Sequence, residues 1–305
     1  MPAVCSSKTI ALLKSLLGFS ILVSATIQLP AYAAANPWEK LPETPLDSAV
    51  YHRAEINGIQ LAYADSGKGP TVILLHGGPA NSSYLSSQVK ALKSRFRVVS
   101  IDTRGHGRSG VDQAPLGYDL FADDAVALMN LLHIDKAHII GWSDGGITGL
   151  DMAMRYPDRV GKVVAFGANV DTKGTYSDAD KKPAFAQFLQ RASGEYEQLS
   201  PTPKGFEHLN AELGRMYATQ PDWTPAQLKT IQAPVLVVDG EHDEVIKPEH
   251  TRYIAASIPT ASVVFIPNTS HFAFIQAPED FNKIVLDFLD APTRLAGVRK
   301  EKSRN

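Results

Sequence analysis

Short runs of apolar residues alternate along the chain with longer helical stretches. The run at 71–75 is apolar almost throughout, as expected of a strand that is buried on both faces. Similar runs predict strands at 97–101, 137–140, 162–166, 234–238 and 262–266. Helices are predicted between them, at 84–94, 120–133, 146–156, 248–257 and 278–289. Because such alternation is typical of right-handed crossovers, we expect an α/β fold with a mostly parallel sheet and helices on both faces.

Two segments depart from this alternation. Asn57-Gly58 separates apolar stretches at 52–56 and 59–64, which predicts a β-hairpin. The segment at about 170–230 has helical stretches and no clear strand, so we expect a helical cap over the carboxyl ends of the strands, where open α/β sheets bind ligands. Aromatic residues of this cap either face a ligand or form its own small core; they are Tyr176, Phe185, Phe188, Tyr196, Phe206, Tyr217 and Trp223.

The segment 1–33 is typical of a signal peptide. A positively charged start precedes an apolar run at 16–29, which is too short and too poorly flanked for a membrane-spanning helix. Small residues then predict cleavage near Ala33 or Ala35. We therefore expect an exported protein, periplasmic or secreted, with no integral membrane segment after removal of the signal. The alternative is an uncleaved N-terminal anchor.

Removal of this signal leaves about 270 residues, enough for one large domain with a substantial core. We expect an irregular lead-in at 34–50, an α/β domain at 51–290 and a disordered tail at 291–305. Cys5 is the only cysteine and lies within the signal. The mature chain is therefore predicted to have no disulfide, no thiolate nucleophile and no cysteine-ligated metal.

The charge of the mature chain excludes some classes of partner. Loss of Lys8 and Lys14 changes the net charge from −2 to −4, and the remaining charges are evenly mixed. Such a surface argues against nucleic acid or an anionic membrane as partner. None of the nine histidines has the spacing H-x-H-x-D or H-E-x-x-H, so we expect no metal site. The segment 102–109 lacks the spacing of a phosphate-binding loop and is interpreted as a structural turn.

The segment Gly141-Trp142-Ser143-Asp144-Gly145 lies between a predicted strand and a predicted helix. A G-x-S-x-G sequence in this context is typical of a nucleophile elbow, a sharp turn that exposes one hydroxyl above the sheet. Glycines are needed because larger side chains would clash with the neighbouring strand and helix. The pattern predicts Ser143 as the nucleophile; the alternative is a surface serine in a glycine-rich turn.

A serine nucleophile needs a base and an acid that orients the base. In this kind of fold the order along the chain is Ser, Asp or Glu, then His. Asp243 and His271 follow the last two predicted strands, at the same edge of the sheet as Ser143. They are the predicted acid and base. Asp239, close to its strand, and Asp171, after the preceding strand, are the alternatives to Asp243.

Two backbone N–H groups are the predicted oxyanion donors. One belongs to Asp144, directly after the nucleophile, and the other to Gly78 in His76-Gly77-Gly78-Pro79, which follows the strand at 71–75. Pro79 has no N–H to donate. His76 is predicted to brace this loop rather than to transfer protons.

These segments together resemble the α/β-hydrolase superfamily from about 52 to 289. The resemblance implies the α/β-hydrolase fold, a catalytic triad of Ser143, Asp243 and His271, and no cofactor. The elbow resembles that of the valacyclovir hydrolase (biphenyl hydrolase-like) group, and the sequence around Gly78 resembles prolyl aminopeptidases. Haloalkane dehalogenases and epoxide hydrolases look similar but have an aspartate at the position of Ser143.

The leading hypothesis is a serine hydrolase that cleaves a small-molecule carboxylic ester through an acyl-enzyme. Lactonase, aminoacyl or prolyl amide hydrolase and C–C hydrolase are alternatives with the same triad, and a ligand receptor is the non-enzymatic one. Asp144 and Trp142 are predicted substrate contacts. The carboxylate of Asp144 is costly if it is buried and unpaired. It either meets a positive group of the substrate or pairs internally, with a backbone N–H or a cap lysine.

Overall fold

One sheet of eight strands organises the computed structural model, which describes residues 36–292. The strand order is β1-β2-β4-β3-β5-β6-β7-β8. The first two strands form an antiparallel hairpin, and β2 pairs with β4 in antiparallel orientation. All other pairs are parallel. The strands are β1 (Tyr51–Ile56), β2 (Ile59–Ser66), β3 (Thr71–Leu75), β4 (Arg97–Asp102), β5 (Ala137–Trp142), β6 (Val160–Phe166), β7 (Val235–Gly240) and β8 (Ala261–Ile266).

The hairpin turn explains why β1 and β2 pair as they do. Asn57 has φ 44° and Gly58 has φ 82°, both in the left-handed region. Asn and Gly tolerate this region best, and two such residues give the turn whose twist matches the strands. The predicted hairpin is therefore confirmed, with Ile56 opposite Ile59.

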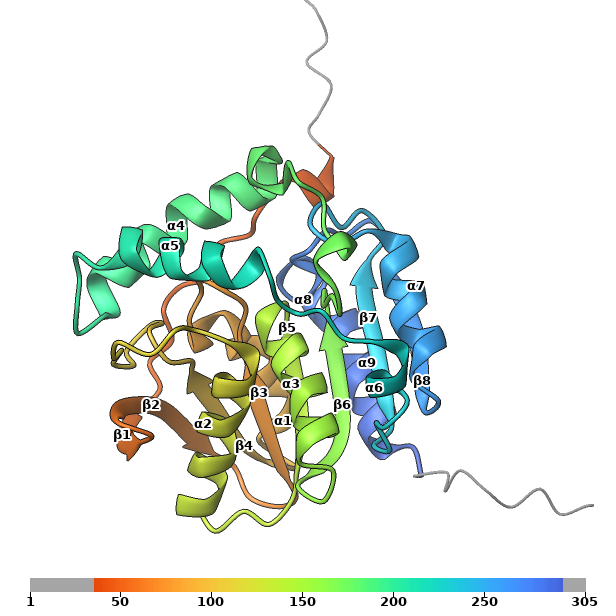
Figure 1. Ribbon diagram of the computed structural model, residues 1–305, viewed down its shortest axis with the longest axis horizontal. Coiled ribbons are helices and arrows are strands. Elements are labelled where there is room, and N and C mark those ends of the chain that lie inside the picture. Colours follow the sequence, from red (N-terminus) through yellow and green to blue (C-terminus); the bar gives the residue numbers. More distant parts are fainter. Residues whose placement is uncertain (1–35, 293–305) are drawn as a thin grey trace, which may run out of the picture. The chain divides into compact units, whose positions relative to one another are not determined.

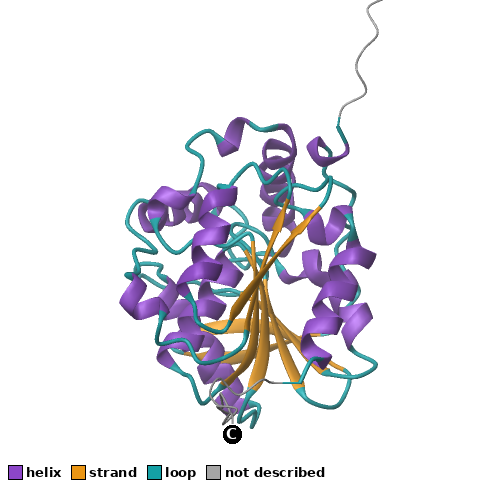
Figure 2. Cartoon of the chain, turned by 90° about the vertical axis from the view of Figure 1, so that its right-hand side faces the viewer, coloured by secondary structure: helices purple, strands orange, loops and turns teal. Residues whose placement is uncertain are grey.

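Helices cover both faces of the sheet, as Figure 2 shows. One buried apolar cluster includes Phe121, Leu150 and Ile254, and the other includes Leu92 and Phe281. The α/β-hydrolase type of fold predicted from the sequence is confirmed. The helices of the main domain are α1 (Ser86–Leu92), α2 (Tyr118–Leu131), α3 (Asp144–Arg155), α7 (Pro248–Ser257), α8 (Ala273–Gln276) and α9 (Pro278–Asp290).

The helices between β6 and β7 are η3 (Thr172–Gly174), η4 (Ala179–Lys181), α4 (Pro183–Leu199), α5 (Phe206–Tyr217) and α6 (Pro225–Leu228). Of these, α4 and α5 lie across the upper end of the sheet in Figure 1, whereas α6 lies lower, near α7. Phe188 and Tyr196 are buried, and Phe206 and Trp223 pack partly buried against the core. The cap aromatics therefore have two different roles, because the other three line a cavity: Tyr176, Phe185 and Tyr217.

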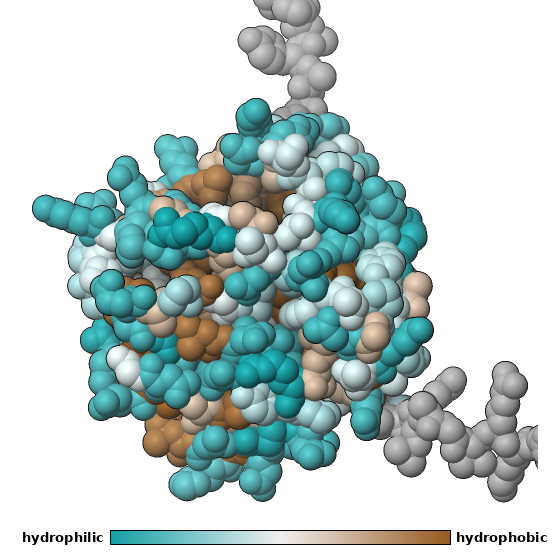
Figure 3. Space-filling model, viewed as in Figure 1, coloured by the Kyte–Doolittle hydropathy of each residue, from teal (hydrophilic) through white to brown (hydrophobic). Residues whose placement is uncertain are grey.

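The segment before β1 is irregular apart from one turn, η1 (Pro37–Glu39). The predicted signal peptide at 1–33, its cleavage at Ala33 or Ala35, and the predicted tail from residue 293 onward lie outside the described residues. Within residues 36–292, no helix combines the length and apolar character needed to span a membrane. The face drawn in Figure 3 is mostly hydrophilic, with apolar side chains exposed in small, separate groups.

Candidate active site

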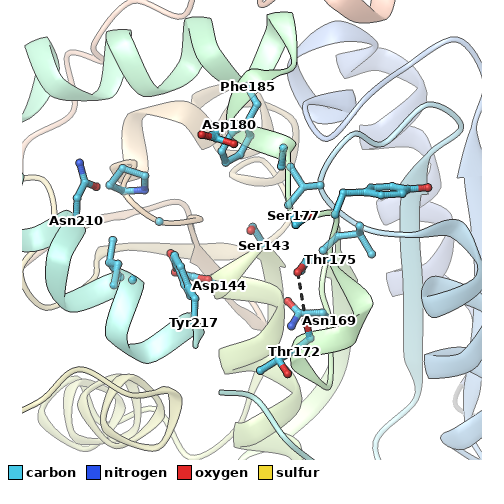
Figure 4. Close-up of a pocket in the computed structure, with 18 of the residues that line it drawn as sticks. Ser143, Asp144, Asn169, Thr172, Thr175, Ser177, Asp180, Phe185, Asn210 and Tyr217 are labelled. Atoms are coloured by element: carbon cyan, nitrogen blue, oxygen red, sulfur yellow. Dashed lines mark hydrogen bonds between the residues drawn. The ribbon is translucent and has the colours of Figure 1, made fainter. Parts of the chain in front are cut away.

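Ser143 stands between the end of β5 and the start of α3, with φ 52° and ψ −119°. This is an unusual backbone conformation for a residue other than glycine, and such strain concentrates at functional sites. A Cβ at Gly141 would lie 2.0 Å from the carbonyl oxygen of Gly145, and a Cβ at Gly145 would lie 2.1 Å from that of Leu75. The close approach of strand and helix therefore requires both glycines, and the turn directs Ser143 into a cavity (Figure 4).

Asp243 and His271 lie side by side, beyond the ends of β7 and β8. Nδ1 of His271 is 2.7 Å from Oδ2 of Asp243, and both side chains are buried. The other oxygen, Oδ1, accepts hydrogen bonds from the backbone N–H groups of Val245 and Ile246, each at 2.7 Å. With both oxygens engaged, the carboxylate has one orientation and holds the imidazole in place.

The other ring nitrogen of His271 is free to act. Nε2 is buried and has no hydrogen-bond partner among residues 36–292. Trp142, which precedes Ser143, donates its indole N–H to the carbonyl oxygen of His271 at 3.0 Å, so the two loops are joined directly. In structures without substrate, the hydrogen bond between a base and its nucleophile is often long or absent.

The electrostatics of this pair favour a charged histidine. Burial lowers the pKa of His271, but the charge and hydrogen bond of Asp243 outweigh burial, so this pKa lies above its ordinary value. Burial raises the pKa of Asp243, and the imidazolium of His271 more than compensates, leaving it below its ordinary value. Asp243 is therefore ionised and stabilises a proton taken up by His271.

The two alternative acids occupy other positions. Asp239 lies in β7 and accepts a hydrogen bond from Thr251. Burial and the nearby charge of Asp243 raise the pKa of Asp239 well above its ordinary range, which disfavours its ionised form. Asp171 caps η3, where it accepts the backbone N–H of Lys173 at 2.8 Å.

Glu244 is a second carboxylate beside His271, and no motif pointed to it. Its Oε2 accepts the backbone N–H of His271 at 3.1 Å, while its buried Oε1 has no partner among the described residues. Burial, followed by the charge of Asp243, raises the pKa of Glu244 to about 7. Its charge therefore changes near neutral pH, next to the loop that carries His271.

The predicted oxyanion donors differ in what surrounds them. The N–H of Asp144 is the first of α3, and the first N–H groups of a helix have no acceptor within the helix. Gly78 packs against the carboxylate of Asp144, since a Cβ at Gly78 would lie 2.5 Å from its Oδ2, and the Gly78 N–H helps to lower the pKa of that carboxyl. The N–H of Asp144 therefore has no acceptor within its own helix, and the N–H of Gly78 lies near the side chain of Asp144.

The carboxylate of Asp144 is buried and pairs internally. Tyr118 at the start of α2 donates to Oδ1 at 2.9 Å, and Tyr217 at the end of α5 donates to Oδ2 at 2.7 Å. Burial raises the pKa of Asp144, while these two hydrogen bonds oppose the increase. The groups that stabilise its charge are thus two hydroxyls, the imidazolium of His271 and the Gly78 N–H, and no cap lysine is among them.

Trp142 was predicted to contact the substrate, but the structure places it elsewhere. Its ring is 2% exposed, lies among Tyr84, Phe188 and Phe274, and is not part of the cavity wall. The prediction is wrong because alternate residues of a strand point to opposite sides of the sheet. Trp142, the last residue of β5, packs in the core against Phe188 of the cap helix α4 rather than facing the cavity.

The loops after β3 and β4 are braced as expected. His76 is buried; its Nδ1 donates to the carbonyl oxygen of Gly77 at 2.8 Å and its Nε2 accepts the backbone N–H of Thr103 at 3.0 Å. Burial lowers the pKa of His76, so its ring is neutral. Asp102 receives the backbone N–H groups of Ser82 and Arg108, which makes the segment 102–109 a structural turn.

A cavity of about 330 Å³ opens in front of Ser143. Figure 4 shows Asp144, Tyr217 and Asn210 to the left of Ser143 and Asp180 and Phe185 above it. Among its walls, within residues 36–292, no side chain is basic. This volume is in the range of pockets that enclose small molecules.

Comparisons with known proteins agree with this architecture. The family model described as the alpha/beta hydrolase fold matches residues 70–206. The human serine hydrolase BPHL is 30% identical over 259 residues, covering 78% of this chain and 85% of that protein. A Pseudomonas putida hydrolase of 2-hydroxy-6-oxononadienedioate and 2-hydroxy-6-oxononatrienedioate is 30% identical over 263 residues, covering 76% and 92%.

Among solved structures, the enol-lactonase from Burkholderia xenovorans LB400 aligns with a TM-score of 0.64 and 25% identity. The alignment covers 79% of this chain and 100% of the enol-lactonase. The chain belongs to the α/β-hydrolase superfamily, as its motifs predicted. Its relatives are hydrolases, which supports an enzyme of the same general class.

Proposed function

We propose that this protein is an exported serine hydrolase that cleaves a small-molecule carboxylic ester through Ser143, Asp243 and His271. The observation that carries the proposal is the 2.7 Å contact between Asp243 and His271, on a loop that Trp142 joins by a hydrogen bond to the elbow of Ser143. Ser143 itself is held at φ 52° and lines a cavity. The name of the human relative, a serine hydrolase, supports the same class.

In the proposed reaction, Nε2 of His271 takes the proton of Ser143 as the hydroxyl attacks the ester carbonyl. The N–H of Asp144 donates to the developing oxyanion, at the positive end of α3. The N–H of Gly78 is the proposed second donor to the oxyanion. His271 then gives its proton to the leaving alcohol, and a water molecule activated by His271 releases the acid.

The same triad can cleave a lactone, an amide or a C–C bond, so the triad does not identify the substrate. The charge of the cavity walls indicates which substrates can bind there. The Pseudomonas relative acts on dienedioates, which carry two carboxylates. Asp144 and Asp180 line this cavity without a basic side chain among the described residues. Such walls repel a dianion, which favours neutral or positively charged substrates.

We predict that an α-amino ester reacts faster than its desamino analogue. Asp144 is buried and forms no salt bridge with another described residue, so a substrate ammonium near it gains a charge-assisted hydrogen bond, worth roughly ten- to a hundredfold in kcat/KM. The preference should disappear in Asp144→Asn while the rate of the desamino ester stays the same. Asp180→Asn, at the other carboxylate of the cavity, is the matched control. Equal kcat/KM values for both esters in the wild type would refute this preference.

The pH dependence of kcat/KM on a neutral ester tests the proposed base. His271 must be neutral to accept the proton of Ser143, so activity should fall on the acid side with an apparent pKa above the ordinary histidine value. Glu244→Gln keeps an acceptor for the backbone N–H of His271 but removes negative charge. Less negative charge disfavours the imidazolium, so the acid limb should move to lower pH. Glu195→Gln, a buried acid of the cap, should leave the limb unchanged.

A substrate panel separates the enzymatic alternatives. Matched esters, lactones and aminoacyl amides of similar size should be assayed with the mature protein, and the proposal expects the highest kcat/KM for esters. A clear preference for lactones or amides would leave the proposed triad unchanged but would change the type of bond that the enzyme is proposed to cleave. Binding of these compounds without turnover of any of them would favour a ligand receptor on the same fold.

Export is the remaining part of the proposal, supported by the pattern of residues 1–35 alone. Mass spectrometry of the protein from its native cell should find a chain that begins at Ala34 or Asn36. An intact Met1 in a soluble cytoplasmic fraction would contradict export.

A further inference from the structure

The segment before β1 touches one of the two loops that carry the triad. The ring of Trp38 stacks on the imidazole of His242, with centroids 3.7 Å apart and planes 18° from parallel. His242 directly precedes Asp243, and its backbone N–H donates to the carbonyl oxygen of Thr269 at 2.9 Å. Trp38 therefore packs on the backbone segment that sets the position of the Asp243 carboxylate.

The same segment is hydrogen-bonded to the other loop through Gln276. The Nε2 of Gln276 donates to the carbonyl oxygens of Trp38 and Lys40, at 3.1 and 2.9 Å. Its Oε1 accepts the backbone N–H of Ser270 at 2.8 Å, one residue before His271. One amide side chain thus links the N-terminal segment to the loop of the catalytic base.

A third set of contacts reaches the cap. The guanidinium of Arg191, in α4, donates to the carbonyl oxygen of Pro42 at 2.7 Å and to the hydroxyl of Thr44 at 2.8 Å. Gln187, one turn earlier in α4, donates to the carbonyl oxygen of Glu39 at 3.3 Å. Between the residues that form these hydrogen bonds lies Leu41, which is buried. The segment is therefore anchored along the outer side of the cap helix.

These contacts join three parts of the site that are otherwise far apart in sequence. The helix α4 contributes Phe185 and Leu189 to the cavity wall, while the two loops hold Asp243 and His271. We infer that residues 36–44, here called the strap, are a positioning device that fixes the cap and both triad loops relative to one another. The inference rests on the proposed serine hydrolase function. Cleavage at the predicted signal sites would leave the whole strap in the mature chain.

The strap should matter for catalysis more than for folding. Trp38, Pro42 and Thr44 are only partly buried, whereas the two large apolar clusters of the domain lie against the sheet. Small displacements of catalytic groups are costly, because a shift of about 1 Å can reduce a rate by about a hundredfold. Loss of the strap's contacts is therefore expected to change kinetics with little change in melting temperature.

Trp38→Ala should lower kcat by about tenfold or more with little change in KM, because it releases the loop of Asp243 but not the cap. It should also lower the pKa of His271, since a looser Asp243 stabilises the imidazolium less. Trp38→Phe preserves a stacking ring and should restore most of kcat. Tyr253→Ala is the matched control, because Tyr253 also packs on a histidine, His250, but away from the triad.

Arg191→Ala should act at the other end of the strap. It releases the cap helix, so KM should rise while kcat changes little, and Arg191→Lys should restore KM in part. Melting temperature, kcat, KM and the NMR titration of the His271 imidazole should be measured for every variant. A wild type without turnover would reject the proposed hydrolase, and the NMR titration would still test the strap. Unchanged kinetics and an unchanged His271 titration in an active Trp38→Ala enzyme would overturn the strap inference.

Discussion

Replacement of Ser143 by alanine should reduce kcat by on the order of 10⁶, because the proposed reaction passes through a single hydroxyl. The fold should persist, since alanine has the same Cβ as serine and keeps the backbone conformation of the elbow. Its melting temperature should lie close to that of the wild type. Steady-state turnover of a neutral ester, combined with thermal unfolding, measures both quantities.

Ser177→Ala is the control for this experiment, because Ser177 also lines the cavity and is exposed there. It should retain nearly all of the wild-type kcat. Residual activity above about one hundredth in Ser143→Ala would remove Ser143 from the mechanism, because water and the oxyanion donors alone do not supply that much of the rate.

The sheet was predictable because each of its parallel strands contains a short, mostly apolar run. The strand at 71–75 matches the structure residue for residue, and the Asn57-Gly58 turn places the hairpin without any tertiary information. The helix α6 and the single turns of the cap were not predicted. They are three or four residues long, so they show no periodicity that a sequence pattern can reveal.

The site was predictable where its chemistry depends on the backbone. Gly141 and Gly145 are required by the approach of strand and helix, so the elbow of Ser143 has a sequence signature. The hydrogen-bond partners of the Asp144 side chain have no such signature in the sequence. Tyr118 and Tyr217 lie 26 and 73 residues away, and only the packing of the cap on α2 brings their hydroxyls to one carboxylate.

Glu244 and Trp38 mark a further limit of prediction from sequence. Glu244 follows a predicted catalytic residue, but its proximity to His271 depends on how two loops meet. Trp38 lies in a segment without helical or strand periodicity, so only the structure shows that it stacks on His242. Irregular segments acquire their roles from tertiary contacts.

Asp243→Asn should lower kcat by about 10⁴, because it leaves His271 in the wrong tautomer. The N–H groups of Val245 and Ile246 both point at Oδ1, so the asparagine must keep its oxygen there and turn its amide N–H₂ toward Nδ1 of His271. Nδ1 then accepts, the proton moves to Nε2, and Nε2 has no lone pair for the proton of Ser143.

The decisive comparison for this acid is with Asp171→Asn. Asp171 is one of the alternatives to Asp243 that the sequence offers, and it lies outside the Asp243–His271 pair. An asparagine there keeps an oxygen for the N–H of Lys173, so the cap of η3 survives and kcat should stay within about twofold of the wild type. Steady-state kinetics and melting temperatures of both variants decide between the two acids. A mild Asp243→Asn with a severe Asp171→Asn would transfer the role to Asp171, because only the residue that orients His271 controls its tautomer.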